Sequence, residues 1–154
     1  MKTLFILLVV YQIKHFLADF PLQTPYMLGK FKGGLDWVLP LLAHVAVHGA
    51  GTYMIACIFG RPEIAFTLAF FDMGIHFAMD RVKASPNLLG RYKAMSANEM
   101  TAIVNTTEYI GPAYKGWVNG AVRSNKLFWW ALGVDQMVHH LTHYGIIYMI
   151  VRGA

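Results

Sequence analysis

The chain has 154 residues, of which 56% are hydrophobic and 14% charged, whereas soluble domains average about 25% charged residues. By length this is one domain, and its composition favours an integral membrane protein. Cys57 is the one cysteine, which excludes a disulfide framework, and the net charge of +5 indicates membrane topology rather than a nucleic-acid partner.

Four apolar segments are long enough to cross a bilayer as helices. Pro21 ends the first because proline cannot continue a helix, and Gly60, Arg61 and Pro62 make a tight turn between the second and the third. We therefore predict an all-α, polytopic membrane protein in which residues 1–154 form a single domain, a bundle of four transmembrane helices. The predicted spans cover residues 3–20, 36–59, 63–83 and 127–151.

The connection between the third and fourth spans, residues 84–126, is rich in Ser, Asn, Gly and Pro, and its apolar runs are too short to cross a membrane. Ser96 and Glu99 have the spacing of a capping box, which predicts a short amphipathic helix over residues 97–109. Aromatic side chains such as Trp117 suit a segment that lies at the level of the lipid headgroups.

Basic residues are concentrated on one side of the predicted membrane. The side formed by the first and third connections carries nine Lys and Arg residues, and the opposite side carries three. The positive-inside rule then places the connection 84–126 in the cytoplasm and both termini outside, in the inner (cytoplasmic) membrane of a bacterium. The nine are Lys30, Lys32, Arg81, Lys83, Arg91, Lys93, Lys115, Arg123 and Lys126, and the three are Lys2, Arg61 and Arg152.

The third span contains the segment DMGIHFAMDRVK, in which Asp72, His76, Asp80 and Lys83 recur at steps of four, four and three. These steps place all four side chains on one face of a helix. Ionisable groups at membrane depth are expensive, and they therefore indicate a functional site.

The other three spans also carry His and Asp residues one helical turn apart, and all seven histidines lie inside the predicted spans. At about 1.5 Å per residue, these positions fall within roughly the same 15 Å of the cytoplasmic leaflet. We therefore expect them to meet in one pocket. The predicted metal ligands are His15, Asp19, His44, His48, His76, Asp80, Asp135 and His139.

Neutral imidazoles and ionised carboxylates are the ligands that zinc, manganese and iron prefer, so a divalent metal, foremost zinc, is the predicted cofactor. The set exceeds what one four-coordinate ion needs, which leaves open two ions, or one ion with supporting aspartates. Interhelical hydrogen bonding without a metal is the simpler alternative. The catalytic candidates are Asp72, His140 and Lys83, and Gln136 and Gln23 are further candidates for a base or a supporting group.

Three sequence motifs resemble a family of small bacterial and phage membrane proteins of unknown function. They are HFLADFPLQ (residues 15–23), HFAMDRVK (residues 76–83) and DQMVHH (residues 135–140), which follow the patterns H-x-x-x-D-F-x-x-Q, H-x-x-x-D-x-x-K and D-Q-x-x-H. The resemblance implies an integral membrane protein. More distantly, the H-x-x-x-D spans are similar to membrane-bound metal-dependent hydrolases, which favours hydrolysis.

The predicted function is metal-dependent hydrolysis of a lipid-linked or phosphate-bearing substrate at the cytoplasmic leaflet, with Lys83 and Arg81 attracting the phosphate. An ion- or proton-coupled transport protein is the first alternative. A non-catalytic membrane interaction protein with a polar core is the second. The expected partners are membrane lipids, a lipid-like substrate and further copies of the chain, with no nucleic acid.

Overall fold

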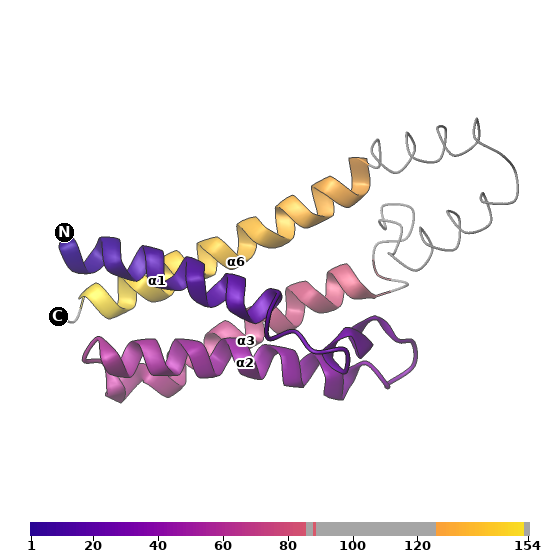
Figure 1. The fold of residues 1–154 in the computed structure, drawn as a ribbon, viewed down its shortest axis with the longest axis horizontal. Coiled ribbons are helices and arrows are strands. Elements are labelled where there is room, and N and C mark those ends of the chain that lie inside the picture. The colour runs from indigo at the N-terminus through magenta and orange to yellow at the C-terminus, as the bar shows by residue number, and fades with distance from the viewer. Residues whose placement is uncertain (86–87, 89–125, 153–154) are drawn as a thin grey trace, which may run out of the picture.

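The computed structural model describes residues 1–85, 88 and 126–152. Within these ranges the protein is all-α and contains no strand. A short 3₁₀ helix lies between the first two long helices (Figure 1). The elements are α1 (Lys2–Asp19), η1 (Met27–Phe31), α2 (Val38–Ile58), α3 (Pro62–Ala84) and α6 (Lys126–Arg152).

Each long helix coincides closely with one of the apolar segments, so the all-α prediction and the helix positions are confirmed. Helix α1 ends at Asp19, just before Pro21, and α2 ends at Ile58, just before Gly60. Pro62 stands in the first turn of α3, where its missing N–H is not needed. The short helix predicted over residues 97–109 lies outside the described residues.

Helices α2 and α3 form an antiparallel hairpin with the most extensive contact in the described fold. Gly60 occupies the turn with φ +79°, a left-handed conformation that glycine adopts without strain. The helices pack tightly at Gly49, where an added Cβ would lie 2.5 Å from Cγ of Met73. Arg61 ties this turn to α6, because its guanidinium donates to the carbonyl oxygen of Met149 at 3.0 Å.

The interior has an apolar half and a polar half, which follow one another along the length of the bundle. The apolar half lies toward the two chain ends and the α2–α3 turn, which share one end of the bundle (Figure 1). Its buried side chains come from all four long helices, and the polar half begins directly beyond them. The apolar half consists of Leu7, Tyr11, Ile55, Ala56, Ala65, Leu68, Ile146, Ile147 and Ile150.

The outer surface is rich in large apolar side chains, among them Ile58, Phe66 and Phe70, which are 78%, 65% and 67% exposed. By length and apolarity, α2 is the single described helix that qualifies as a membrane span, a test that the core helix of a soluble protein also passes. The four-span prediction is therefore not supported by composition. The physical reason is that α1, α3 and α6 carry charged residues and imidazoles, which lower their hydropathy.

Candidate metal centre

The polar half of the interior is built from one face of each long helix, together with η1. Residues four apart stand one above the other on a helix, so the His and Asp pairs of the sequence all turn inward. The result is a polar core rich in His and Asp. Its buried members are Lys14, His15, Lys30, His44, His48, Thr52, Asp72, His76, Asp80, Asp135, His139, Thr142 and His143.

Asp72 lies at the inner end of this core, next to the apolar half, and is fully buried. Lys14 Nζ donates to Asp72 Oδ2 at 2.5 Å, and Thr52 Oγ1 donates to the same oxygen at 2.7 Å. The other oxygen, Oδ1, lies 3.3 Å from His76 Nε2 and 3.5 Å from His143 Nε2. A carboxylate placed so deep is thus neutralised by a lysine from another helix.

Asp80 and Asp135 lie at the opposite, outer end of the polar core, and both are also paired with lysine. Lys30 Nζ donates to Asp80 Oδ2 at 3.0 Å, and Lys83 Nζ donates to Asp135 Oδ2 at 2.6 Å. Lys83 Nζ is also 3.9 Å from Asp80 Oδ1. Lys30 reaches the core from η1, so the connection between α1 and α2 supplies part of the site.

Asp19 is different, because among the described residues no lysine or arginine lies within ion-pair distance of it. Its contacts within that distance are with imidazoles. Asp19 Oδ2 lies 3.1 Å from His15 Nε2, and Oδ1 lies 3.0 Å from His48 Nε2 and 3.5 Å from His44 Nε2. Among the described aspartates of the polar core, Asp19 is therefore the one that has no lysine in an ion pair with it.

The imidazoles of His76 and His139 are buried, and neither ring nitrogen of either residue has a hydrogen-bond partner. The two rings are stacked, with centroids 3.9 Å apart, and the His48 ring lies 3.8 Å from that of His76. Buried ring nitrogens are normally hydrogen-bonded or bound to a metal. These buried ring nitrogens could therefore serve as ligand atoms for a metal ion.

Five groups of three side chains have ligand atoms within 4.8 Å of one another among the described residues. Three of these groups share members and describe one location, which we call the central position. A fourth group contains Asp72 and the fifth contains Asp80, so each already has a lysine against it. We call these the inner and the outer position. The central position comprises His15, Asp19, His44, His48, His76 and His139, the inner position Asp72, His76 and His143, and the outer position Asp80, Asp135 and His139.

The structure thus brings all eight predicted ligands into the polar core but divides them between positions. Of the three catalytic candidates, Asp72 and Lys83 are held in ion pairs. Arg81, expected to attract phosphate, places its guanidinium 3.8 Å over the ring of Trp37. Gln23 is half-buried and makes no side-chain hydrogen bond within the described ranges.

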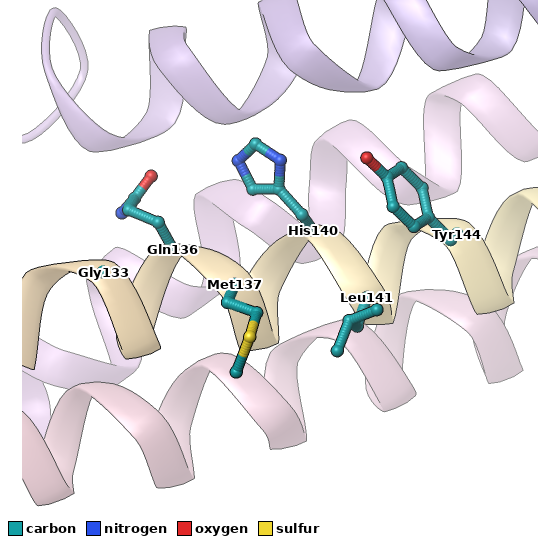
Figure 2. Close-up of a pocket in the computed structure, with 6 residues that line it drawn as sticks. All are labelled: Gly133, Gln136, Met137, His140, Leu141 and Tyr144. Atoms are coloured by element: carbon teal, nitrogen blue, oxygen red, sulfur yellow. The ribbon is translucent and has the colours of Figure 1, made fainter. Parts of the chain in front are cut away.

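His140, the third catalytic candidate, lies outside the ligand groups and lines a groove of about 340 Å³ along α6. Figure 2 shows Gln136, His140 and Tyr144 pointing from α6 toward α1. Gln136 Oε1 hydrogen-bonds His15 Nε2 at 3.1 Å. The groove therefore adjoins the central position, with Gln136 between them. Its lining residues are Gly133, Gln136, Met137, His140, Leu141 and Tyr144.

Sequence reasoning missed the roles of three side chains in the polar core. Lys30 lies in a connection between predicted spans, and nothing in its sequence context distinguishes it from Lys32. Thr52 carries no charge and its spacing gives no signal. His143 is not among the predicted ligands, and the signal that could have found it is its position four residues after His139, on the same helix face.

Comparison with curated proteins finds no match to this chain, and comparison with solved structures also finds none. One family model matches residues 4–152, which is nearly the whole sequence. The chain therefore belongs to the family described as "Protein of unknown function (DUF3307)".

Proposed function

We propose that the protein is a membrane-embedded metal enzyme that holds one divalent ion at the central position and hydrolyses an amphipathic, phosphate-bearing substrate. The observation that carries the proposal is the distribution of charge in the polar core. Three aspartates have lysine partners at 2.5 to 3.0 Å. Among the described residues, the ion-pair contacts of Asp19 are with imidazoles and not with a lysine or arginine. A divalent cation supplies the positive charge that this one location lacks.

Membrane embedding is supported by the distribution of polarity, which is the reverse of that in a soluble protein. Ionised groups such as Lys14 and Asp72 lie inside, whereas Phe66 and Phe70 face outward. In a bilayer, charged groups must face the bundle interior and pair there. The residues that lower the hydropathy of α1 and α3 are therefore largely the ones that the fold buries. We keep four spans, with both termini outside the cytoplasm, as the topology of the proposal.

The ligands are proposed to come from the central position. His15, Asp19 and His48 each belong to two of its three ligand groups, and His76 and His139 contribute ring nitrogens without a hydrogen-bond partner. A set of imidazoles with one carboxylate suits zinc, and manganese or iron as second choices. Such a metal acidifies a bound water and polarises a phosphoryl oxygen, which is the chemistry of hydrolysis.

The substrate class is proposed from the surroundings of the central position. The groove along α6 joins polar Gln136 and His140 to apolar Met137 and Leu141, which suits a molecule with a polar head and a lipid tail. Lys83 remains 29% exposed in spite of its ion pair with Asp135. It therefore offers positive charge at the outer end for a phosphate.

Metal content of the detergent-purified protein tests the proposal most directly. His139→Ala removes an unpartnered imidazole of the central position, and we expect at least a tenfold weaker affinity for zinc. His140→Ala is the matched control, because His140 is the next residue of the same helix and stands outside the ligand groups. Elemental analysis that finds no stoichiometric metal in the wild type would contradict the proposal.

Hydrolysis is tested separately with phosphate-bearing lipids presented in detergent micelles. We expect phosphate release that a chelator abolishes and added zinc restores. His139→Ala should lower this activity in proportion to its loss of metal. If the protein binds metal but hydrolyses none of these lipids, the metal-binding claim stands and the claim of hydrolysis is contradicted.

Ion- or proton-coupled transport is the second candidate, favoured by the continuity of the polar core. Lys14, Asp72 and His76 at the inner end adjoin the central position, which adjoins Asp80 and Lys83 at the outer end. Such a chain of ionisable groups can relay protons. Proton flux into proteoliposomes that Asp72→Asn abolishes, without any lipid hydrolysis, would favour this candidate.

A further inference from the structure

The inner position has the composition of a metal site. Asp72, His76 and His143 place ligand atoms within 4.8 Å of one another, and all three side chains are fully buried. Asp72 Oδ1 is buried and has no hydrogen-bond partner. A carboxylate and two imidazoles gathered in this way are a common ligand set for zinc.

A different cation already occupies this place. Lys14 Nζ lies 2.5 Å from Asp72 Oδ2 and 3.4 Å from both His143 Nε2 and His48 Nδ1. It therefore stands among oxygen and nitrogen atoms that would otherwise face a metal. The Thr52 hydroxyl completes the surroundings by donating to the same carboxylate oxygen.

The fold makes room for the lysine side chain. The aliphatic part of Lys14 crosses α2 at Gly51, where an added Cβ would lie 3.0 Å from Cγ and 3.3 Å from Cε of Lys14. Lys14 itself is buried on the inward face of α1, together with His15 and Ala18. The absence of a side chain at Gly51 thus lets the Lys14 side chain pass α2 and place its ammonium group against Asp72.

We propose that the ammonium group of Lys14 takes the place of a second metal ion at the inner position, so that the polar core binds one metal ion rather than two. An ammonium and a divalent ion a few ångströms apart in a buried site repel strongly, so the two cations exclude each other. His76 is shared between the inner and central positions. With Lys14 beside Asp72, His76 is left for the central position. The claim that the polar core binds one metal ion rests on the proposed function. The claim that Lys14 keeps a metal ion out of the inner position does not.

The test replaces the ammonium with an uncharged side chain of similar length, in the full-length protein in detergent. Lys14→Met should bind one more equivalent of zinc per chain than the wild type. The double variant Lys14→Met/Asp72→Asn should return to the wild-type number, because the carboxylate is gone. Lys32→Met is the matched control, since Lys32 is exposed and its replacement removes the same charge.

The outcomes separate this inference from the proposed function. A wild type without metal together with one equivalent in Lys14→Met would end the proposed function and support the inference. Equal metal content in the folded Lys14→Met variant and the wild type would overturn the inference. Should Lys14→Met fold only when zinc is supplied, the metal is replacing the lysine, as we infer. If Lys14→Met fails to fold even with zinc, while the double variant Lys14→Met/Asp72→Asn folds, the inference is overturned.

Electron paramagnetic resonance of the wild type with excess manganese gives a test that needs no variant. We expect the spectrum of isolated ions, because the inner position is taken. A spectrum of two coupled ions in the wild type would show that the polar core holds two metal ions in spite of Lys14, and would overturn the inference.

Discussion

At the scale of single residues, aspartates of the polar core differ in their environments, because different side chains of the neighbouring helices face them. Asp72 is held by Lys14 and the hydroxyl of Thr52, whereas Asp19 is surrounded by imidazoles. A buried charge that keeps one partner but loses another is left under-satisfied, which is more costly than the net value of the lost hydrogen bond. Thr52 therefore matters to stability out of proportion to its size.

Thr52→Val removes the hydroxyl and keeps the shape, so Asp72 Oδ2 loses the donor at 2.7 Å. We expect the free energy of unfolding to fall by about 1–3 kcal/mol, measured by denaturant titration in detergent. Thr67→Val is the control, because Thr67 is an exposed residue of α3. A Thr52→Val variant as stable as Thr67→Val would show that the hydroxyl does not support the Asp72 carboxylate.

At the scale of the elements, the α2–α3 hairpin has the most extensive helix–helix contact of the described fold, and α1 and α6 place their ligands against it. Its close packing depends on Gly49, whose missing side chain leaves room for Met73. Small residues at helix interfaces allow backbones to approach closely in this way. The positions of His48 on α2 and His76 on α3 follow from that approach, since both lie within about one helical turn of the contact.

Gly49→Ala should push Met73 away, because the added Cβ would lie 2.5 Å from its Cγ and 2.6 Å from its Sδ. We expect a loss of about 1–3 kcal/mol in the free energy of unfolding, as is typical of overpacking. The double variant Gly49→Ala/Met73→Ala should recover part of the lost free energy of unfolding, because the smaller side chain makes room for the added Cβ. Gly74→Ala is the control, since nothing lies within 4 Å of that Cβ position.

Should Gly49→Ala and Gly74→Ala have equal stability, the close approach of α2 and α3 would not limit the packing. The same variant bears on the site. A displaced α3 separates His76 from His48, so the zinc affinity of Gly49→Ala should fall together with its stability. Gly74→Ala should keep both, because its added methyl group meets open space.

At the scale of the whole molecule, the described bundle has charge inside and apolar side chains outside. Exposed Phe5, Phe66 and Trp130 cover different helices, so the apolar surface is not confined to one docking face. Water would penalise this arrangement and a bilayer would not. The natural environment proposed for the fold is therefore lipid, although by composition alone α2 is the single described span.

We expect the protein to remain in the membrane fraction after alkaline carbonate extraction of bacterial membranes. A cysteine introduced at Glu63, in the Cys57→Ser background, should react with a membrane-impermeant maleimide added from outside, as should one at Lys2. A cysteine at Lys32 should react only after lysis. Release by carbonate would contradict membrane embedding, and reversed labelling would contradict the topology alone.

Much of the fold was accessible from the sequence because its signals are local. Apolar segments bounded by Pro21 and the Gly60–Pro62 turn predicted the helices closely, and one-turn spacing predicted which face of each helix would turn inward. Membership of an uncharacterised family was also foreseen, and it is confirmed over residues 4–152. The prediction of four membrane spans went further than composition supports.

The sequence alone therefore determined that four helices would each carry ionisable side chains on one face, because helical periodicity is written into the order of the residues. Only the tertiary structure decided which carboxylate each cation would meet: Lys14 with Asp72, Lys30 with Asp80, and, within the described part of the chain, no lysine with Asp19. Those pairings depend on the depth and rotation of helices far apart in the chain. Local spacing carries no information about either.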